Sequence, residues 1–330
     1  MNLGFFESNV FPEVLRLLSD GQVHSGEELG MLLGVSRAAV WKTLKKFELV
    51  GLDVISIKGK GYCIKGGLDL LDESEIQAQF QEFLDIKVFA QVDSTNSYLL
   101  RQNNPERKVC LAESQTAGRG RRGRAWVSPF AQNLYLSIGW GFEGGIAVLE
   151  GLSLVVGLAL VRSLRRCGVC DLQVKWPNDI LYKDRKLGGV LIEINGDPAG
   201  YCVAVIGIGL NVSMRGDYAS SIEQPWSSLD QVFDEQNILP VGRNRLASHL
   251  LSELNSILSR YQTDGFSAYK DEWISIASYL NQSVYIHKGN HIQQGIFCGI
   301  DDSGALVLEA DGSELVFHGG EVSLRREYVS

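Results

Sequence analysis

Residues 25–47 hold the pattern that most constrains the fold, because two helix starts follow one another across a single glycine. Ser25 to Glu28 reads S-x-x-E, a capping box in which side-chain oxygens satisfy the free amides at a helix start. Gly34 is expected to end that helix, and Ser36 to cap the next one. Two short helices joined by a glycine turn are typical of a helix-turn-helix, whose second helix enters the major groove of DNA.

The second helix, residues 37–47, should bury one side and expose a basic one. Val40, Leu44 and Phe47 recur at helical spacing and predict the buried side. A preceding helix is expected at residues 11–18. The middle helix should bury its apolar side, which is made of Leu29, Leu32 and Leu33.

Two short strands, residues 54–57 and 62–64, flank Lys58 and Lys60 and predict a basic hairpin, the wing of a winged helix-turn-helix. From residue 37 to 65, basic side chains outnumber acidic ones seven to two. This local excess favours DNA binding over a trihelical domain used only for packing or protein contacts. The expected DNA-binding residues are Ser36, Arg37, Ala38, Lys42, Lys45, Lys58 and Lys60.

The whole chain has the composition of an ordinary globular protein, with 330 residues, 45% hydrophobic, 21% charged and a net charge of -8. Its length predicts two or three domains, and its charge argues against a protein that coats nucleic acid with its entire surface. The apolar stretch 152–161 is shorter than a membrane span, which needs about 20 residues, and the N-terminus lacks a basic leader. We expect a cytoplasmic protein without membrane contact.

Six cysteines in such a chain are expected to be reduced thiols. Cys167 and Cys170 form a C-x-x-C, but no second pair stands at metal spacing. No tightly bound structural metal is therefore expected.

Residues 118–124 place four arginines on a glycine-rich loop in this acidic chain. Guanidinium groups bind phosphate oxygens with forked, charged donors, and glycines let backbone amides approach a ligand. Alone, the segment fits a solvated or nucleic-acid-facing patch equally well. Asp93 to Asn96 would cap a helix starting near Ser97 and offer its free amides to a ligand, although alone it reads as an ordinary helix start.

Two lysines lie on a predicted hairpin further along the chain. Leu172, Val174 and Trp176 alternate on one strand face, which turns Lys175 to the opposite side. After the turn, Lys186, Gly188 and Val190 are expected to share a face, so that glycine leaves space beside Lys186 for a ligand. A lysine placed there can offset charge on a carboxylate attacking a phosphate. Either lysine alone would read as a solvated surface residue.

The last motif, residues 205–211, reads as a buried strand whose Gly207 and Gly209 permit close backbone approach, without the third glycine of a dinucleotide fingerprint. A polar segment follows that carries Arg215 and Trp226, and its indole could stack on a base. From about residue 281, short alternating strands separated by turns at 288–290, 301–304 and 311–312 predict a small β barrel.

Taken in order, the segments DSTN (93–96), GRGRRGR (118–124), KWPND (175–179) and RKLGG (185–189) resemble those of the biotin-protein ligases. With its N-terminal domain, the chain resembles the bifunctional members that also repress the biotin operon. The Gly-Gly-Gly-x-Val-x-His-Asp segment of the related lipoate ligases is absent. In the loop after Arg215 only Trp226 aligns with the family.

The resemblance implies an enzyme that joins biotin to ATP as biotinyl-adenylate and passes the biotin to a lysine of biotin carboxyl carrier protein. Its catalytic residues would be Lys186, Arg121 and Lys175. Biotin would be held by Ser94, Thr95, Asn96, Gln115, Arg119, Gly120, Arg121, Lys186, Gly207 and Gly209. The nucleotide would be held by Arg121, Trp126, Asn178, Asp179, Asn211, Arg215, Trp226 and Arg325, with Mg²⁺ reaching Asp179 through ATP.

We therefore expect an α+β multidomain fold: a winged helix-turn-helix at 1–66, an α/β ligase domain with a mixed sheet at 67–277, and an SH3-like small β barrel at 278–330. The expected partners are the carrier protein, operator DNA and a second copy of the chain in a ligand-dependent homodimer. The alternative is a biotin-sensing transcription factor without significant ligase activity, against which the presence of both Lys175 and Lys186 argues.

Overall fold

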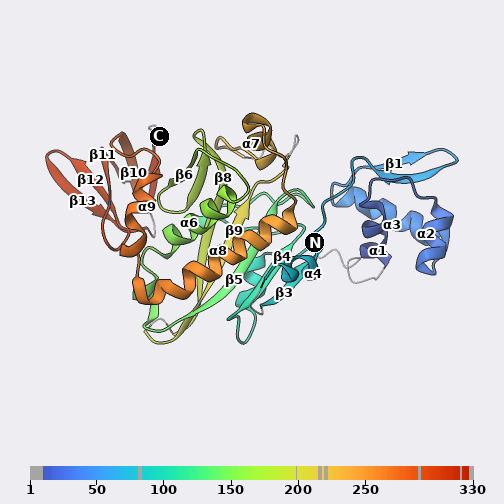
Figure 1. Ribbon diagram of the computed structural model, residues 1–330, viewed down its shortest axis with the longest axis horizontal. Coiled ribbons are helices and arrows are strands. Elements are labelled where there is room, and N and C mark those ends of the chain that lie inside the picture. Colours follow the sequence, from blue (N-terminus) through green and yellow to red (C-terminus); the bar gives the residue numbers. More distant parts are fainter. Residues whose placement is uncertain are drawn as a thin grey trace.

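The computed structural model describes residues 10–80, 84–197, 199–214, 218, 222–288, 291–319 and 322–326. Three parts follow one another along the molecule (Figure 1): a helical N-terminal part at one end, a central sheet with helices, and a C-terminal β-sheet at the other end. The predicted class, a helix-turn-helix followed by a mixed α/β domain and a β-rich domain, is confirmed.

The N-terminal part contains α1 (Val10–Leu18), α2 (Gly26–Leu33), α3 (Arg37–Leu49) and the antiparallel hairpin of β1 (Val54–Ile57) and β2 (Gly61–Ile64). Ser25 and Glu28 form both bonds of the capping box, and Ser36 caps α3. Gly34 ends α2 at φ 66°, a left-handed conformation that favours glycine. The pattern in the sequence therefore predicted this unit correctly.

One expectation about α2 was wrong. Leu32 is 60% exposed, whereas Leu29 is fully buried, and Gly26 and Gly30 complete the buried side. Because a Cβ on Gly30 would lie 2.7 Å from the Val35 carbonyl oxygen, the backbone of the following turn packs directly on the helix there. The buried side is thereby rotated away from Leu32.

The core of the N-terminal part continues into the central part. Phe11 and Phe47 meet edge to face, with ring centroids 4.7 Å apart, at its centre. Phe130 and Ala131, which come from the central domain, belong to the same apolar cluster and are buried. The two parts therefore share packed side chains as well as a covalent linker.

The linker after β2 is fixed by a buried ion pair. Arg243, the first residue of α8, places Nη1 2.8 Å from Glu113 Oε2, and both side chains are almost fully buried. Arg243 also donates to the carbonyl oxygens of Asp69, from Nε at 2.8 Å, and of Asn133, from Nη1 at 3.1 Å. The Leu71 amide donates to Glu113 Oε1 at 2.7 Å. Linker, sheet and α8 are thus held together at one point.

The central sheet has the order β3-β4-β5-β9-β8-β7-β6 and is mixed, since only β3 and β4 pair in parallel. Its strands are β3 (Asp85–Phe89), β4 (Lys108–Ala112), β5 (Leu134–Phe142), β6 (Leu172–Lys175), β7 (Asp179–Tyr182), β8 (Arg185–Gly196) and β9 (Cys202–Leu210). The helices of this part are α4 (Glu73–Ala78), α5 (Thr95–Leu100), α6 (Leu152–Arg165), α7 (Leu229–Gln236), α8 (Arg243–Asp264) and α9 (Lys270–Ser275). Short 3₁₀ turns span Arg121–Gly123, Gly145–Leu149 and Ser267–Tyr269.

Helices cover both faces of this sheet. α6 and α8 pack together on one face, where the main core lies (Figure 1). α5 packs on the other face, where Leu99 meets Cys110 and Val205. Within the described residues, one stretch, Gly145–Arg165, is long and apolar enough to cross a membrane, and α6 within it buries 11 of its 14 residues in the protein core.

The C-terminal part is a five-stranded antiparallel sheet with the order β13-β12-β11-β10-β14. Its strands are β10 (Ser283–Lys288), β11 (His291–Ile300), β12 (Leu306–Ala310), β13 (Ser313–Phe317) and β14 (Val322–Arg325). The turns predicted at residues 301–304 and 311–312 are present, and the predicted turn at 288–290 includes residues outside those described. Trp176 Nε1 donates to the Gly304 carbonyl at 3.1 Å and ties this sheet to the central domain.

Candidate active site

The site forms where α5, the arginine loop of residues 118–124 and the β6–β8 strands meet the face of β9. Two glycines of β9 allow this approach. A Cβ on Gly207 would lie 2.2 Å from Asn96 Oδ1, and one on Gly209 would lie 2.4 Å from the Trp126 indole. Such distances are too short for non-bonded atoms, so a side chain at either position would displace Asn96 or Trp126.

The small polar side chains of residues 94–96 and Gln115 lie together on one side of the site. Ser94 caps α5, so the helix starts at Thr95, two residues before the predicted start. Gln115 Oε1 accepts from the Thr95 amide at 2.9 Å and from its hydroxyl at 3.2 Å. Gln115 Nε2 donates to Ser128 Oγ at 3.1 Å. These bonds fix a cluster of polar side chains beside the glycines.

The arginine loop is anchored on the site by its own backbone and by two guanidinium groups. The Gly120 amide donates to the Arg124 carbonyl at 2.7 Å, and Arg122 adopts a left-handed conformation with φ 58°. Arg119 Nη2 lies 2.8 Å from Glu193 Oε2. Arg121 Nη1 donates to Asn178 Oδ1 at 3.0 Å, and its Nη2 donates to the Gly319 carbonyl. Burial lowers the pKa of Arg121.

Lysines and arginines gather around a single carboxylate. Lys186 Nζ lies 2.7 Å from Asp179 Oδ1 and 5.2 Å from the centre of the Trp126 ring. The pKa of Lys175 is lowered, first by burial and then by Lys186 and Arg325, while Asp179 acts in the opposite direction. Asp179 also raises the pKa of Arg121 against the effect of burial. Positive charge exceeds negative charge here, which suits an anionic ligand.

The glycine beside Lys186 is Gly189, and the prediction of Gly188 was wrong. Strands β7 and β8 shift register between Ile180 and Leu181, because Leu187 is an extra residue in β8. A bulge reverses the alternation of side chains that follow it. A Cβ on Gly189 would lie 3.2 Å from Lys186 Cε, whereas one on Gly188 would meet Leu160 on the α6 side of the sheet.

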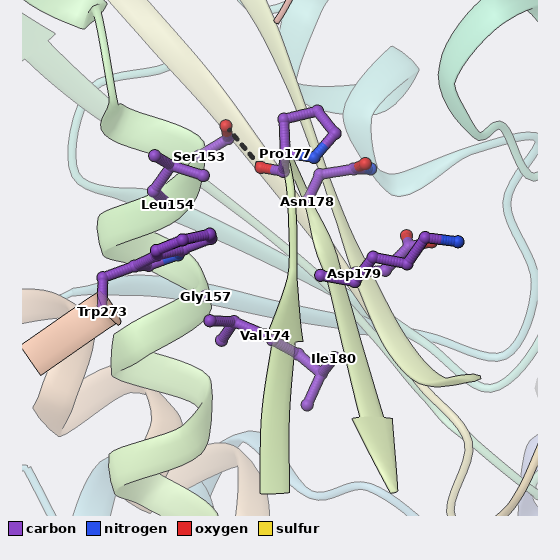
Figure 2. Close-up of a pocket in the computed structure, with 10 residues that line it drawn as sticks. Ser153, Leu154, Gly157, Val174, Pro177, Asn178, Asp179, Ile180 and Trp273 are labelled. Atoms are coloured by element: carbon purple, nitrogen blue, oxygen red, sulfur yellow. Dashed lines mark hydrogen bonds between the residues drawn. The ribbon is translucent and has the colours of Figure 1, made fainter. Parts of the chain in front are cut away.

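A narrow crevice, too tight to hold a water molecule, lies next to the β6–β7 turn (Figure 2). Leu154, Val174 and Trp273 line it from the core side, and Ser153 Oγ donates to the Pro177 carbonyl at 3.0 Å. Asn178 and Asp179 extend toward the other side of the hairpin, away from α6. The crevice is thus a feature of core packing, and the ionic chemistry lies across the strands from it.

Trp226, from the polar segment that follows β9, lies beside Lys186. Lys186 pairs with Trp226 in a parallel bridge, and its amide donates to the Pro225 carbonyl at 2.9 Å. Asn211 Nδ2 donates to the Ser227 carbonyl at 3.1 Å and fixes the end of the segment. Arg215 lies outside the described residues. Trp126 Nε1 is buried and has no hydrogen-bond acceptor within the described part of the chain.

The predicted DNA-binding residues form a separate surface on the N-terminal part. Their side chains are exposed on α3 and at the β1–β2 turn, and Lys45 pairs with Glu48 at 2.8 Å.

Two residues of the central site were missed by the motifs. Ser137 Oγ lies 2.7 Å from Thr95 Oγ1, and Glu193 accepts from Asn96 and Arg119. A serine inside the otherwise apolar residues 134–138 was the available signal for the first.

Comparison with known proteins adds three matches along the chain. The biotin/lipoate A/B protein ligase family matches residues 88–211, an HTH domain matches residues 13–63, and the biotin protein ligase C-terminal domain matches residues 279–325. The bifunctional ligase/repressor BirA of Salmonella typhimurium is 41% identical, over 94% of this chain and 96% of that protein. The protein of the same name from Escherichia coli is 40% identical, over 97% and 98%.

A solved structure shares the fold of most of this chain. The biotin protein ligase from Aquifex aeolicus, in complex with biotin and ATP, aligns with a TM-score of 0.64 and 26% identity. The alignment covers 74% of this chain and all of that one.

Proposed function

Because this chain belongs to the biotin/lipoate A/B protein ligase family, in its bifunctional ligase/repressor branch, we propose that it links biotin chemistry to transcription. The protein is an ATP-dependent biotin-protein ligase that forms biotinyl-5'-AMP and transfers biotin to a lysine of biotin carboxyl carrier protein. It is also a transcriptional repressor whose DNA binding depends on the adenylate. Biotin and ATP are its substrates.

The observation that carries the enzymatic proposal is the excess of cations around Asp179. In adenylation, a carboxylate oxygen of biotin attacks the α-phosphorus of ATP, the bond from that phosphorus to the bridging oxygen breaks, and diphosphate leaves with the electron pair. Both reactants are anions, and charge builds between them. Lys186, Lys175 and Arg121 lie around Asp179 and would offset that charge.

The polar pocket of Ser94, Thr95, Asn96 and Gln115 lies on the other side of the glycines, and we assign it to the head group of biotin. Arg119 and Gly120 then lie along the loop above the ligand. The adenosine side is assigned to Trp126, Asn178, Asn211, Trp226 and Arg325.

Magnesium would arrive with ATP. Mg²⁺ commonly takes one or two carboxylates together with phosphate oxygens and water. Asp179 fits as one such ligand, although no group of three potential metal-binding side chains occurs in the part of the chain that the structure describes. The ion, when bound, would screen the phosphate charges, while the lysines and Arg121 orient the reacting groups.

The ligase assignment is tested by incubating the protein with biotin, ATP, Mg²⁺ and a biotin carboxyl carrier domain, and following the carrier's mass. A mass increase of one biotinyl group is expected. The matched control is the same carrier with its acceptor lysine replaced by arginine, which should stay unmodified. Adenylate formation without transfer, or no adenylate at all, would support the alternative of a biotin sensor without ligase activity.

For the repressor function we propose a ligand-dependent homodimer in the cytoplasm, because one winged helix offers few base contacts and a two-fold pair doubles them. The exposed basic side chains of α3 and the wing support this surface. The test is DNA binding, with and without biotin plus ATP, to fragments selected by the protein from a random library. Lys42→Ala together with Lys58→Ala should weaken binding and leave adenylation unchanged; equal binding by this variant, or binding indifferent to ligand, contradicts the proposal.

A further inference from the structure

Glu193 stands out because it is a carboxylate in a site built to hold anions. It lies on β8 opposite Val205, four residues beyond the last residue of the lysine motif. Its Oε2 accepts from Asn96 Nδ2 at 2.9 Å and from Arg119 Nη2 at 2.8 Å. A carboxylate in this place would repel biotin or phosphate if it faced them, so its contacts with protein donors indicate a different role.

The first of these contacts fixes the orientation of the Asn96 amide. Asn96 Nδ2 also donates to the Leu191 carbonyl at 3.2 Å, so both of its hydrogens are directed to protein acceptors. Its Oδ1 lies 2.6 Å from Ser137 Oγ, which is itself 2.7 Å from the Thr95 hydroxyl. Asn96 is almost fully buried. The pocket for the head group is therefore set partly by a bond from Glu193.

The second contact fixes the arginine loop. Arg119 comes from a different part of the chain than Asn96, and its guanidinium pairs with the Glu193 carboxylate. The side chains of Arg119 and Glu193 are 42% and 25% exposed, so solvent weakens their attraction. A single oxygen of Glu193, Oε2, thus connects Asn96 to Arg119 of the arginine loop.

We propose that Glu193 is a positioning residue that couples the biotin pocket to closure of the arginine loop. It orients Asn96 by hydrogen bonding alone and retains the loop by its negative charge on Arg119. Loss of the charge should therefore loosen the loop, and loss of the whole side chain should disturb the pocket as well. This inference rests on the proposed ligase function.

The two roles separate in the pair Glu193→Gln and Glu193→Ala. Glutamine keeps an oxygen that can accept from Asn96 but carries no charge, whereas alanine removes both. For Glu193→Gln we expect the dissociation rate of biotinyl-adenylate to rise two- to fivefold, the effect of losing a partly exposed ion pair, with the KM for biotin changed less than twofold. For Glu193→Ala we expect both quantities to rise.

Arg119→Ala supplies the second half of the test. If Glu193 acts through Arg119, adding Glu193→Gln to Arg119→Ala should not raise the dissociation rate further. The matched control is Glu253→Gln. It removes the charge of a similar ion pair, in which Glu253 on α8 lies 3.2 Å from Arg166 at the end of α6, and it should leave both quantities unchanged.

The outcomes are distinct. Additive effects of the Arg119 and Glu193 variants, or a Glu193→Gln protein with the wild-type dissociation rate, overturn the coupling. Equal changes of KM in the glutamine and alanine variants overturn the separation of roles. If the wild-type protein itself makes no adenylate from biotin and ATP, the proposed function has failed instead.

Discussion

Replacing Arg243 by alanine should destabilise the protein by about 3–5 kcal/mol, the usual loss when one partner of a buried ion pair is removed. Both side chains of this pair are almost fully buried, with exposed fractions of 2% for Arg243 and 5% for Glu113. The variant leaves the Glu113 carboxylate in the interior without its cation. It also leaves the Asp69 and Asn133 carbonyls without a donor from Arg243.

The free energy of unfolding is measured by urea titration, as the midpoint multiplied by the slope. Arg166→Ala is the matched control, because Arg166 pairs with Glu253 at 3.2 Å but is 48% exposed, and Glu253 is 19% exposed. This variant should lose about 1 kcal/mol or less of its free energy of unfolding. Arg243→Met combined with Glu113→Gln should recover part of the loss, since glutamine still accepts from the Leu71 amide without burying a charge. A loss for Arg243→Ala no larger than the control's refutes the argument.

Four further changes test the site. Lys186→Ala should slow adenylate formation by about 10²–10³, as loss of a preorganised charge does; a normal single-turnover rate contradicts its role. Arg121→Gly should form adenylate more slowly than the wild type and release what it forms, which a blot for biotin on unrelated proteins detects. Gly207→Ala should weaken biotin binding, measured by calorimetry, because its Cβ would lie 2.2 Å from Asn96 Oδ1. Lys175→Arg should keep adenylation active at alkaline pH where the wild type declines, because burial lowers the lysine's pKa and its charge is lost as pH rises through that value.

Local signals in the sequence predicted the elements that depend on local chemistry. Ser25 and Ser36 cap their helices as expected, because a cap is made by residues within three positions of one another. The alternation around Lys175 was equally predictable, since β6 is regular. Thr95, Gln115 and Lys186, which belong to or follow the motifs, lie on one side of the sheet.

Features that depend on pairing between distant strands were not predictable. Leu187 is an extra residue in β8 relative to its partner β7, and the side chains after it therefore change faces. The sequence of either strand, taken alone, does not reveal this shift in register. Glu193 carries no motif, and its importance arises from Asn96 and Arg119, which are distant in the chain. The burial of Phe130 against the N-terminal helices likewise needed the three-dimensional structure.

The shared core at Phe130 and Ala131 means that the DNA-binding part is not an interchangeable cassette. The apolar core around α1 and α3 includes two side chains that the ligase domain contributes. The Ala131 amide donates to the Glu113 carbonyl at 3.0 Å. Close packing leaves no freedom to change one side of such a contact alone. A chimera that takes residues 1–66 from a relative must therefore also take that relative's residues at positions 130 and 131, and deleting residues 1–66 would uncover an apolar patch on the enzyme.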